Sequence, residues 1–193
     1  LSPWTNRRRR DRWADPPLLL EEIVRTVRNR CGADFPVLVK LSGADDTTPG
    51  IRPVDTLKTV HRLEKLDVDA VEISYGTMEY ALNIMRGSCP LDQILEVSPL
   101  FNRIPRLLRR TWKRVCAPRR VRRFLPFNHN YNAANARYIK SRTTVPVITV
   151  GGIRTVEDIA SCLTEAGLDA VSLCRPLICE PDWPKQLAEA QPQ

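Results

Sequence analysis

The chain has 193 residues, with 30 lysines and arginines against 22 acidic residues, which gives a net charge of +8. Apolar residues make up 42% and charged residues 27%, an ordinary composition for a folded domain that excludes a chain disordered throughout. No stretch approaches the roughly 18 uninterrupted apolar residues of a transmembrane helix. No apolar run follows the early basic cluster, so we also expect no signal peptide.

The first predicted elements are a helix and a strand. Residues 18–30 predict a helix whose apolar face is formed by Leu19, Ile23 and Val27. Residues 35–41, with the sequence FPVLVKL, form a short apolar run after a glycine and predict a buried strand.

The same alternation continues along the chain. Apolar residues recur at close to helical spacing over 53–66, where a proline is suited to the first turn of a helix. A second strand is predicted over 68–74 and a third over 145–150, which two glycines end.

The last third of the chain predicts a helix, a strand and a helix. The helix over 156–165 is capped by Thr155, and Asp158 three residues later completes a capping-box pattern. A fourth strand follows over 168–173, and an amphipathic helix over 182–190.

This alternation indicates βα units. The segments VDAVEIS and LDAVSLC are similar and each follows a helix end, as repeated βα units with parallel strands require. A closed (β/α)8 barrel needs about 250 residues. The pattern therefore predicts either half of a barrel or a small open α/β sheet.

A basic segment interrupts the repeat between the second and third strands. No acidic residue occurs between Glu96 and Glu157. Ten positive charges lie within 103–123, interleaved with apolar residues and longer than a plain βα connection needs. This segment is either a solvated insertion that caps a barrel or a surface for nucleic acid or anionic lipid.

The six cysteines do not suggest a metal or disulfide site. They lie at positions 31, 89, 116, 162, 174 and 179, with no CxxC pair and no histidine beside them. We therefore expect free thiols, no metal, and a reducing cytoplasmic location.

Three places could carry chemistry. Gly151 and Gly152 end a strand before a helix, either as a phosphate-binding turn or as a tight turn that needs glycine. Cys174 and Arg175 follow the next strand, and the arginine suits a phosphate or lies on the surface. Lys40 interrupts an apolar strand, where its charge either has a function or reaches solvent.

These segments resemble the second half of the old yellow enzyme family of NADH:flavin oxidoreductases. The segments LSPWTNRRRRDRW, FPVLVKLSGAD, VPVITVGGIRTVED and DAVSLCRPLICEPDWP are similar, in order, to the region after its fourth strand and to its fifth, seventh and eighth strands. The long EISYGTMEYALNIMRG segment resembles the 2,4-dienoyl-CoA-reductase-like branch.

The resemblance implies a fold and a domain organisation. Residues 1–193 would form a single partial barrel domain of the α/β class, strands 5–8 of a TIM (β/α)8 barrel. A basic insertion at about 97–140 would follow strand 6. The first four strands would come from a second chain or be replaced by self-association.

The resemblance also implies FMN as cofactor and NADH or NADPH as reductant, with hydride transfer to an activated alkene or a similar acceptor. Lys40 would lie by the pyrimidine edge of the flavin. Gly151 and Gly152, the backbone of Cys174, and Arg175 would hold its phosphate. Catalytic residues are not assigned, because the segments that carry them in the family are absent. The alternatives are an inactive fragment or a basic module that binds nucleic acid or an anionic surface.

Overall fold

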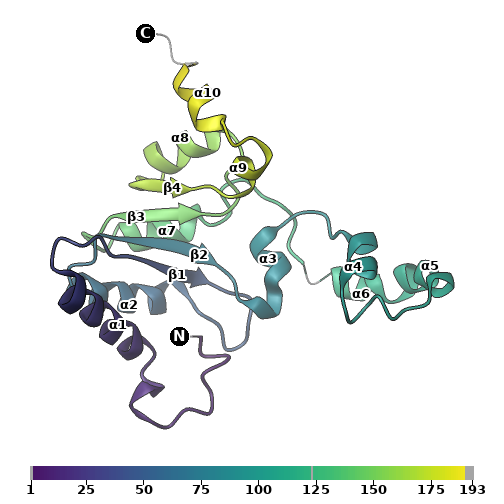
Figure 1. Cartoon of the computed structure of the whole chain (residues 1–193), viewed down its shortest axis with the longest axis horizontal. Coiled ribbons are helices and arrows are strands. Elements are labelled where there is room, and N and C mark those ends of the chain that lie inside the picture. The colour runs from purple at the N-terminus through teal and green to yellow at the C-terminus, as the bar shows by residue number, and fades with distance from the viewer. Residues whose placement is uncertain (1, 123, 190–193) are drawn as a thin grey trace.

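The computed structural model describes residues 2–122 and 124–189 of the chain (Figure 1). Two of the predicted features reach beyond these ranges. Arg123 of the basic segment and Ala190 of the last predicted helix lie outside the described residues.

Four parallel strands form one sheet, and all four were predicted. Their order in the sheet follows their order in the chain. The strands are β1 (Leu38–Ala44), β2 (Ala70–Tyr75), β3 (Val147–Val150) and β4 (Ala170–Ser172). Each begins two or three residues later than predicted. In β1 the reason is local, since Pro36 has no N–H to give to a neighbouring strand and pairing with β2 begins at Leu38.

The predicted helices are confirmed with small shifts at their ends. They are α1 (Pro16–Cys31), α2 (Pro53–Glu64), α8 (Val156–Thr164) and α10 (Trp183–Glu189). Further helical elements were not predicted. These are η1 (Arg12–Ala14), η2 (Met78–Tyr80), α3 (Ala81–Met85), α4 (Leu91–Val97), α5 (Arg106–Val115), α6 (Ala117–Val121), α7 (Ala133–Lys140) and α9 (Arg175–Cys179).

The topology decides between the two predicted folds. Helix α2 connects β1 to β2, α7 precedes β3, and α8 connects β3 to β4. Right-handed crossovers between strands in the order β1-β2-β3-β4 place every helix on the same face, whereas a doubly wound sheet reverses its strand order and has helices on both faces. The chain therefore has the architecture of part of a TIM barrel, and not of a small doubly wound sheet.

The core lies between the sheet and this single layer of helices. Val39, Val71 and Val147 point from three strands toward the helices, where they meet Val60 of α2 and Ile139 of α7. The opposite face carries the alternate residues of each strand, and no helix covers it in the described part of the chain (Figure 1). In a closed barrel that face is the interior.

The predicted apolar face of α1 is wrong. Leu19 and Ile23 are exposed, whereas Val24 is buried and Leu20 packs beside the core. Helical spacing is compatible with either strip of side chains. The neighbouring helix α2 selects the buried strip, because Val24 and Leu20 pack into the apolar core on that side. The Arg62 guanidinium of α2 also forms an ion pair with Glu21.

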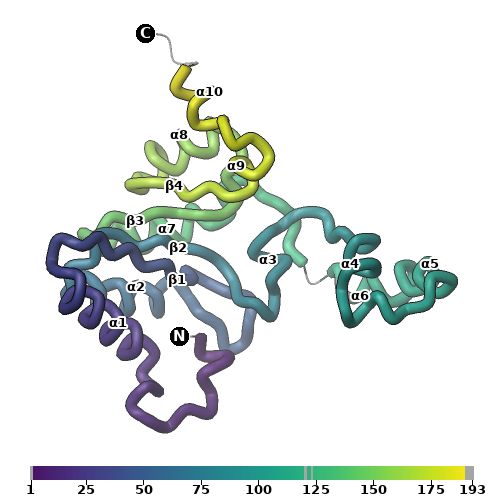
Figure 2. The backbone as a smooth tube through the Cα atoms, in the orientation of Figure 1, coloured from purple at the N-terminus to yellow at the C-terminus, as the bar shows by residue number. Residues whose placement is uncertain are grey.

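A helical arm projects from the sheet between β2 and α7. Helices α4, α5 and α6 lie together and away from the sheet, and α3 lies between them and the strands (Figures 1 and 2). Helix α7, at the end of the segment expected as an insertion, packs against β3 and α2 as a barrel helix does. None of the helices in the described ranges is long and apolar enough to cross a membrane.

Candidate functional site

The candidate residues gather where the parallel strands end. Residues Ile148 to Val150 of β3 pair with residues Ala170 to Ser172 of β4, so the glycine turn after β3 and the Cys174–Arg175 turn after β4 lie at one edge of the sheet. Ligands bind at this carboxyl edge in barrels of this kind. The structure therefore brings four of the five predicted site residues together.

The turn after β3 requires glycine at both positions. Gly151 has φ of 125° and Gly152 has φ of 82°, values that disfavour any side chain. A Cβ on Gly151 would lie 2.6 Å from Cζ of Tyr131, and one on Gly152 would lie 2.6 Å from the carbonyl oxygen of Asn128. The turn is thus packed tightly against the segment 128–131, which supports the plain structural reason for two glycines.

The buried Asn132 fixes this turn to the sheet. Its amide nitrogen donates to the carbonyl of Ile73 at 2.7 Å and to the carbonyl of Val150 at 3.1 Å. One side chain thereby holds the ends of β2 and β3 at a set spacing. The backbone N–H of Asn130 donates to the carbonyl of Gly152 at 3.2 Å, which adds a second connection.

The same edge presents unused backbone donors. No hydrogen bond between described residues uses the N–H groups of Gly151, Gly152, Cys174 or Arg175. The two N–H groups just before α8 are occupied, by contrast, because the Asp158 carboxylate accepts from those of Arg154 and Thr155. An anion at this edge would therefore find its free donors in the two turns.

Arg175 lies exposed beside these donors. Its guanidinium donates to the carbonyl of Arg86 at 3.3 Å and lines a groove of about 580 Å³ between α8, α9 and α10. Arg154 lines the same groove, and its guanidinium lies 3.5 Å from the centre of the Phe127 ring. The Cys174 thiol is exposed and free. Two cations thus line one groove at this edge of the sheet.

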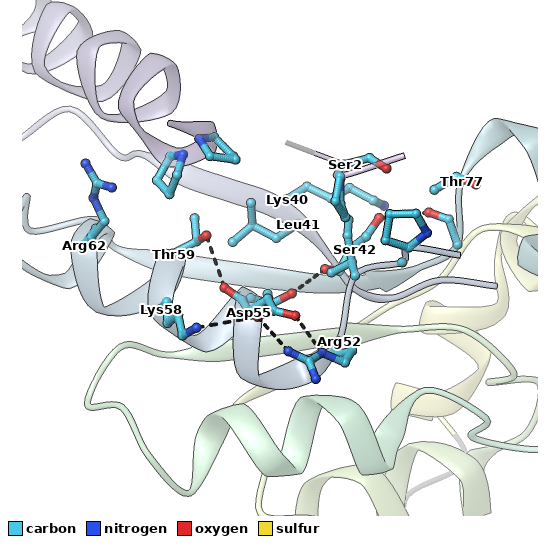
Figure 3. A pocket seen from close by; sticks show the side chains of 18 of the residues that line it. Ser2, Lys40, Leu41, Ser42, Arg52, Asp55, Lys58, Thr59, Arg62 and Thr77 are labelled. Carbon is cyan, nitrogen blue, oxygen red and sulfur yellow. Dashed lines mark hydrogen bonds and ion pairs between the residues drawn. The ribbon is translucent and has the colours of Figure 1, made fainter. Parts of the chain in front are cut away.

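Lys40 lies apart from this group. It is the third residue of β1, on the open face of the sheet, and its ammonium group forms an ion pair with Glu72 of β2. More than half of its side chain is exposed. It lines a cavity of about 1030 Å³ between β1, α2 and the N-terminal segment (Figure 3). Its charge therefore has a partner within the chain.

A polar cluster that the sequence did not reveal lies at the same edge. Asp46 accepts a hydrogen bond from the Tyr75 hydroxyl at 2.7 Å and from the Asn83 amide at 2.9 Å. The Asn83 carbonyl oxygen in turn accepts from the N–H of Leu125 at 2.9 Å. Burial and this bond to Asp46 raise the pKa of Tyr75 to about 12. The cluster joins the ends of β1 and β2 to both ends of the arm.

Arg86 lies at the centre of this edge. It is only 7% exposed and adopts φ of 40°, and its guanidinium lies 4.8 Å from the Tyr75 ring centre and 3.8 Å from that of Tyr131. Burial raises the pKa of Tyr131, although Arg86 and Arg175 act in the opposite direction. The position of Asp46 and Tyr75 just past two predicted strands was the signal that could have revealed this cluster.

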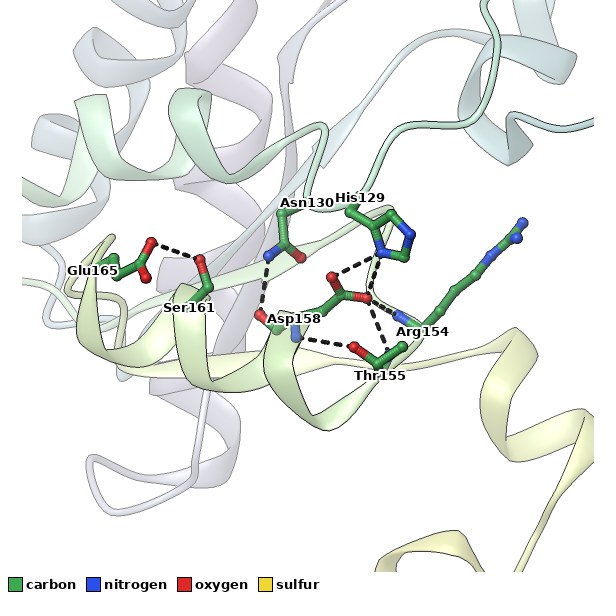
Figure 4. Close-up of polar contacts among 7 residues, drawn as sticks. All are labelled: His129, Asn130, Arg154, Thr155, Asp158, Ser161 and Glu165. Carbon is green, nitrogen blue, oxygen red and sulfur yellow. Dashed lines mark hydrogen bonds and ion pairs between the residues drawn. The ribbon is translucent and has the colours of Figure 1, made fainter.

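His129 makes a defined contact at the start of α8. Its Nδ1 lies 2.9 Å from both carboxylate oxygens of Asp158 (Figure 4). The Asp158 carboxylate also accepts from the backbone N–H groups of Arg154 and Thr155, and Thr155 completes the predicted capping box. Burial raises the pKa of Asp158, but the bonds from His129 and the two N–H groups outweigh it and leave the pKa below its ordinary value.

The arrangement is suited to holding an anion and to placing charge, and it lacks a nucleophile paired with a base. Among the described residues no three histidine, cysteine or acidic side chains are placed to hold a metal ion. The six cysteines are free, and Cys162 is buried. The edge offers backbone N–H donors from two turns, and Arg154 and Arg175 lie at the same edge.

Comparisons with known proteins agree with this architecture. The model of the dihydrouridine synthase (Dus) family matches residues 120–191, which hold α7 to α10. An NADH oxidase of Thermoanaerobacter brockii is 28% identical over 201 residues, which cover 99% of this chain and 24% of the relative. A 2-naphthoyl-CoA reductase in complex with 2-naphthoyl-CoA superposes with a TM-score of 0.69 and 18% identity, over 100% of this chain and 24% of that one.

The chain therefore spans about a quarter of the length of these two relatives. Its fold is that of part of a TIM barrel. The three comparisons together support the old-yellow-enzyme-like superfamily of flavin oxidoreductases, and they support it as a whole and not one branch of it.

Proposed function

We propose that this chain is the C-terminal half of the barrel of an FMN-dependent oxidoreductase and binds the phosphate end of FMN. The observation that carries the proposal is the set of unused backbone donors at Gly151, Gly152 and Cys174, with Arg175 beside them. Free backbone N–H groups and a guanidinium are the usual partners of a phosphate dianion. The residues present fit that group.

Lys40 is proposed to lie against the other end of the cofactor. Two strand spacings, about 10 Å, separate β1 from β3, and the register places Lys40 level with Ile148, about 10 Å along the strand before Gly151. A long ligand that extends from the carboxyl edge onto the open face could contact both. The ammonium group would stabilise negative charge on a reduced ring, and Glu72 would moderate that effect.

When bound, FMN would supply hydride acceptance and donation, and the protein would supply binding, orientation and electrostatics. We propose NADH or NADPH as the reductant and an activated alkene or a similar acceptor as the substrate. A dienoyl-CoA-reductase-like branch agrees with a relative described as an NADH oxidase and a neighbour described as a CoA-ester reductase. The remaining strands would come from a second chain or from self-association.

Replacement of Arg175 by alanine tests the phosphate assignment. A charge-assisted hydrogen bond is worth about 1.5–3 kcal/mol, so Arg175→Ala should raise the dissociation constant for FMN roughly ten- to hundredfold. Quenching of flavin fluorescence on titration with purified protein measures that constant. Arg25→Ala is the matched control, because Arg25 is an exposed arginine on α1 without a side-chain partner among the described residues. Equal constants for wild type and Arg175→Ala would refute the assignment.

A further inference from the structure

Helix α5 of the arm carries its charged and its apolar residues on different sides. One side carries Arg106, Arg110 and Arg114 at four-residue spacing, which places them in a row. The other side carries Leu107, Leu108, Trp112 and Val115. Among the described helices of eight residues or more, none separates apolar from charged residues as sharply.

Part of this helix packs within the arm. The Trp112 ring lies 5.4 Å from the Phe101 ring, centre to centre. The Arg109 guanidinium donates to the carbonyls of Ile104 and Asn102, and the Lys113 ammonium lies 2.6 Å from the Asp92 carboxylate. These contacts pack one side of α5 against the arm, and the rest of the helix surface faces outward.

The outward surface joins an apolar strip to a basic strip. Leu107 is 93% exposed, Leu108 57% and Val115 65%. The neighbouring row of Arg106, Arg110 and Arg114 makes no side-chain hydrogen bond or ion pair with any described residue. Exposed leucines in a folded chain are ordinary singly, but a strip of them beside unpaired arginines indicates a partner.

The arm as a whole is strongly cationic. Nine arginines and one lysine lie within 103–123, and the chain has no acidic residue from 97 to 156. Figure 1 shows the arm standing clear of the sheet, so nothing in the body of the described chain covers α5. The arm is therefore free to meet a large flat surface.

We propose that α5 docks on a lipid bilayer that contains anionic lipid. A short helix with an apolar strip and flanking arginines lies in the plane of such an interface, with its leucines among the acyl chains and its guanidinium groups at the headgroups. Each arginine near an anionic surface adds to the attraction. Nucleic acid would account for the arginines but would leave Leu107, Leu108 and Val115 in water. The inference stands apart from the proposed function, because α5 carries none of the flavin-site residues.

Flotation of the full chain with vesicles tests the proposal. We expect binding to vesicles of phosphatidylcholine with about 30% phosphatidylglycerol, whose negative surface attracts basic segments, and little binding to phosphatidylcholine alone. Leu107→Gln/Leu108→Gln and, separately, Arg106→Gln/Arg110→Gln/Arg114→Gln should each lower the partition coefficient about tenfold or more. Both sets change exposed side chains, and circular dichroism checks that the fold is retained.

The matched control is Arg8→Gln/Arg25→Gln/Arg30→Gln, which removes the same charge from exposed arginines outside the arm. It should bind like the wild type. If this control lost as much vesicle binding as the α5 arginine variant, or if the leucine variant bound like the wild type, net charge alone would explain the binding. Either result would overturn the proposal. Absence of wild-type binding to anionic vesicles would also overturn it. So would binding to a 20-nucleotide RNA without vesicle binding, or a dimer that the leucine variant dissociates.

Discussion

At the scale of single residues, the Asp158 carboxylate joins several parts of the site through its hydrogen bonds. This buried carboxylate caps α8, holds His129 from the preceding loop, and accepts from Arg154 N–H at 2.8 Å. The loop that carries His129 is the same one that packs against the glycine turn. The cap of one helix thus also positions the proposed phosphate site.

Asp158→Asn should therefore destabilise the protein by about 1–3 kcal/mol at pH 6, because it weakens a cap and a charge-assisted bond together. The pKa of Asp158 lies below its ordinary value, so its stabilising contribution is present above about pH 4 and is lost as the pH falls through the folded pKa. The difference between wild type and variant should shrink at pH 3. Urea unfolding at both pH values measures it, with Asp34→Asn as the control, because Asp34 is exposed and its carboxylate makes no hydrogen bond or ion pair with a described residue. A difference that stays constant with pH would contradict this account.

Because Lys40 pairs with Glu72, replacing either residue should shift the reduction potential of a bound flavin, in opposite directions. Lys40→Met should lower the reduction potential by about 30 mV or more, which for a two-electron couple corresponds to about 1.4 kcal/mol. Glu72→Gln should raise it, since the ammonium charge is then less compensated. Potentiometric titration of the FMN-loaded protein measures both, and Lys65→Met should change nothing, because Lys65 is exposed at the end of α2 and does not line this cavity. An unchanged or higher potential in Lys40→Met would show that Lys40 faces elsewhere.

At the scale of secondary structure, local signals placed the elements of the sheet well. The capping box at Thr155 and Asp158 formed as predicted, because both partners lie within one turn. The inward strip of α1 was mispredicted, because a second element selects it. The helices of the arm were not predicted either, although its positive charge was evident from the sequence. They depend on contacts such as that of Trp112 with Phe101, which the spacing of residues in the chain does not reveal.

The site was predictable to a similar degree. Gly151 and Arg175 could be placed at strand ends from sequence, and parallel pairing then brought them together. Arg86 could not be predicted, because its burial depends on Tyr75 and Tyr131, which are 56 residues apart in the chain and meet only in the fold. The ion pair of Lys40 likewise depends on strand register.

At the scale of the whole molecule, the sheet has two free edges and one open face within residues 2–122 and 124–189. Leu38 is exposed on the open face of edge strand β1, and Ile23 is exposed on α1. Unpaired strand edges and uncovered apolar side chains favour association with another chain. This is the surface that a complementary half-barrel would cover.

The purified chain should therefore self-associate and should not reduce an enone by itself, because a held substrate, a held flavin and a proton donor are needed in one geometry. Size-exclusion chromatography and an assay of NAD(P)H oxidation with added FMN measure these properties. Ile23→Gln/Leu38→Gln should reduce self-association, whereas Leu163→Gln on α8 should not. A monomer that binds FMN stoichiometrically and turns over an enone would mean that the described chain is sufficient.

The sequence by itself determined the βα alternation, the four strands, the glycine turn and the basic character of the arm, because each follows from residues close together in the chain. Tertiary structure decided that the strands keep their sequence order, that the helices share one face, and that Arg86 is enclosed between two tyrosines. The physical reason is the range of the interactions. Backbone propensity and capping act within a few residues, whereas strand order, side-chain burial and ion pairing depend on which distant segments the fold brings into contact.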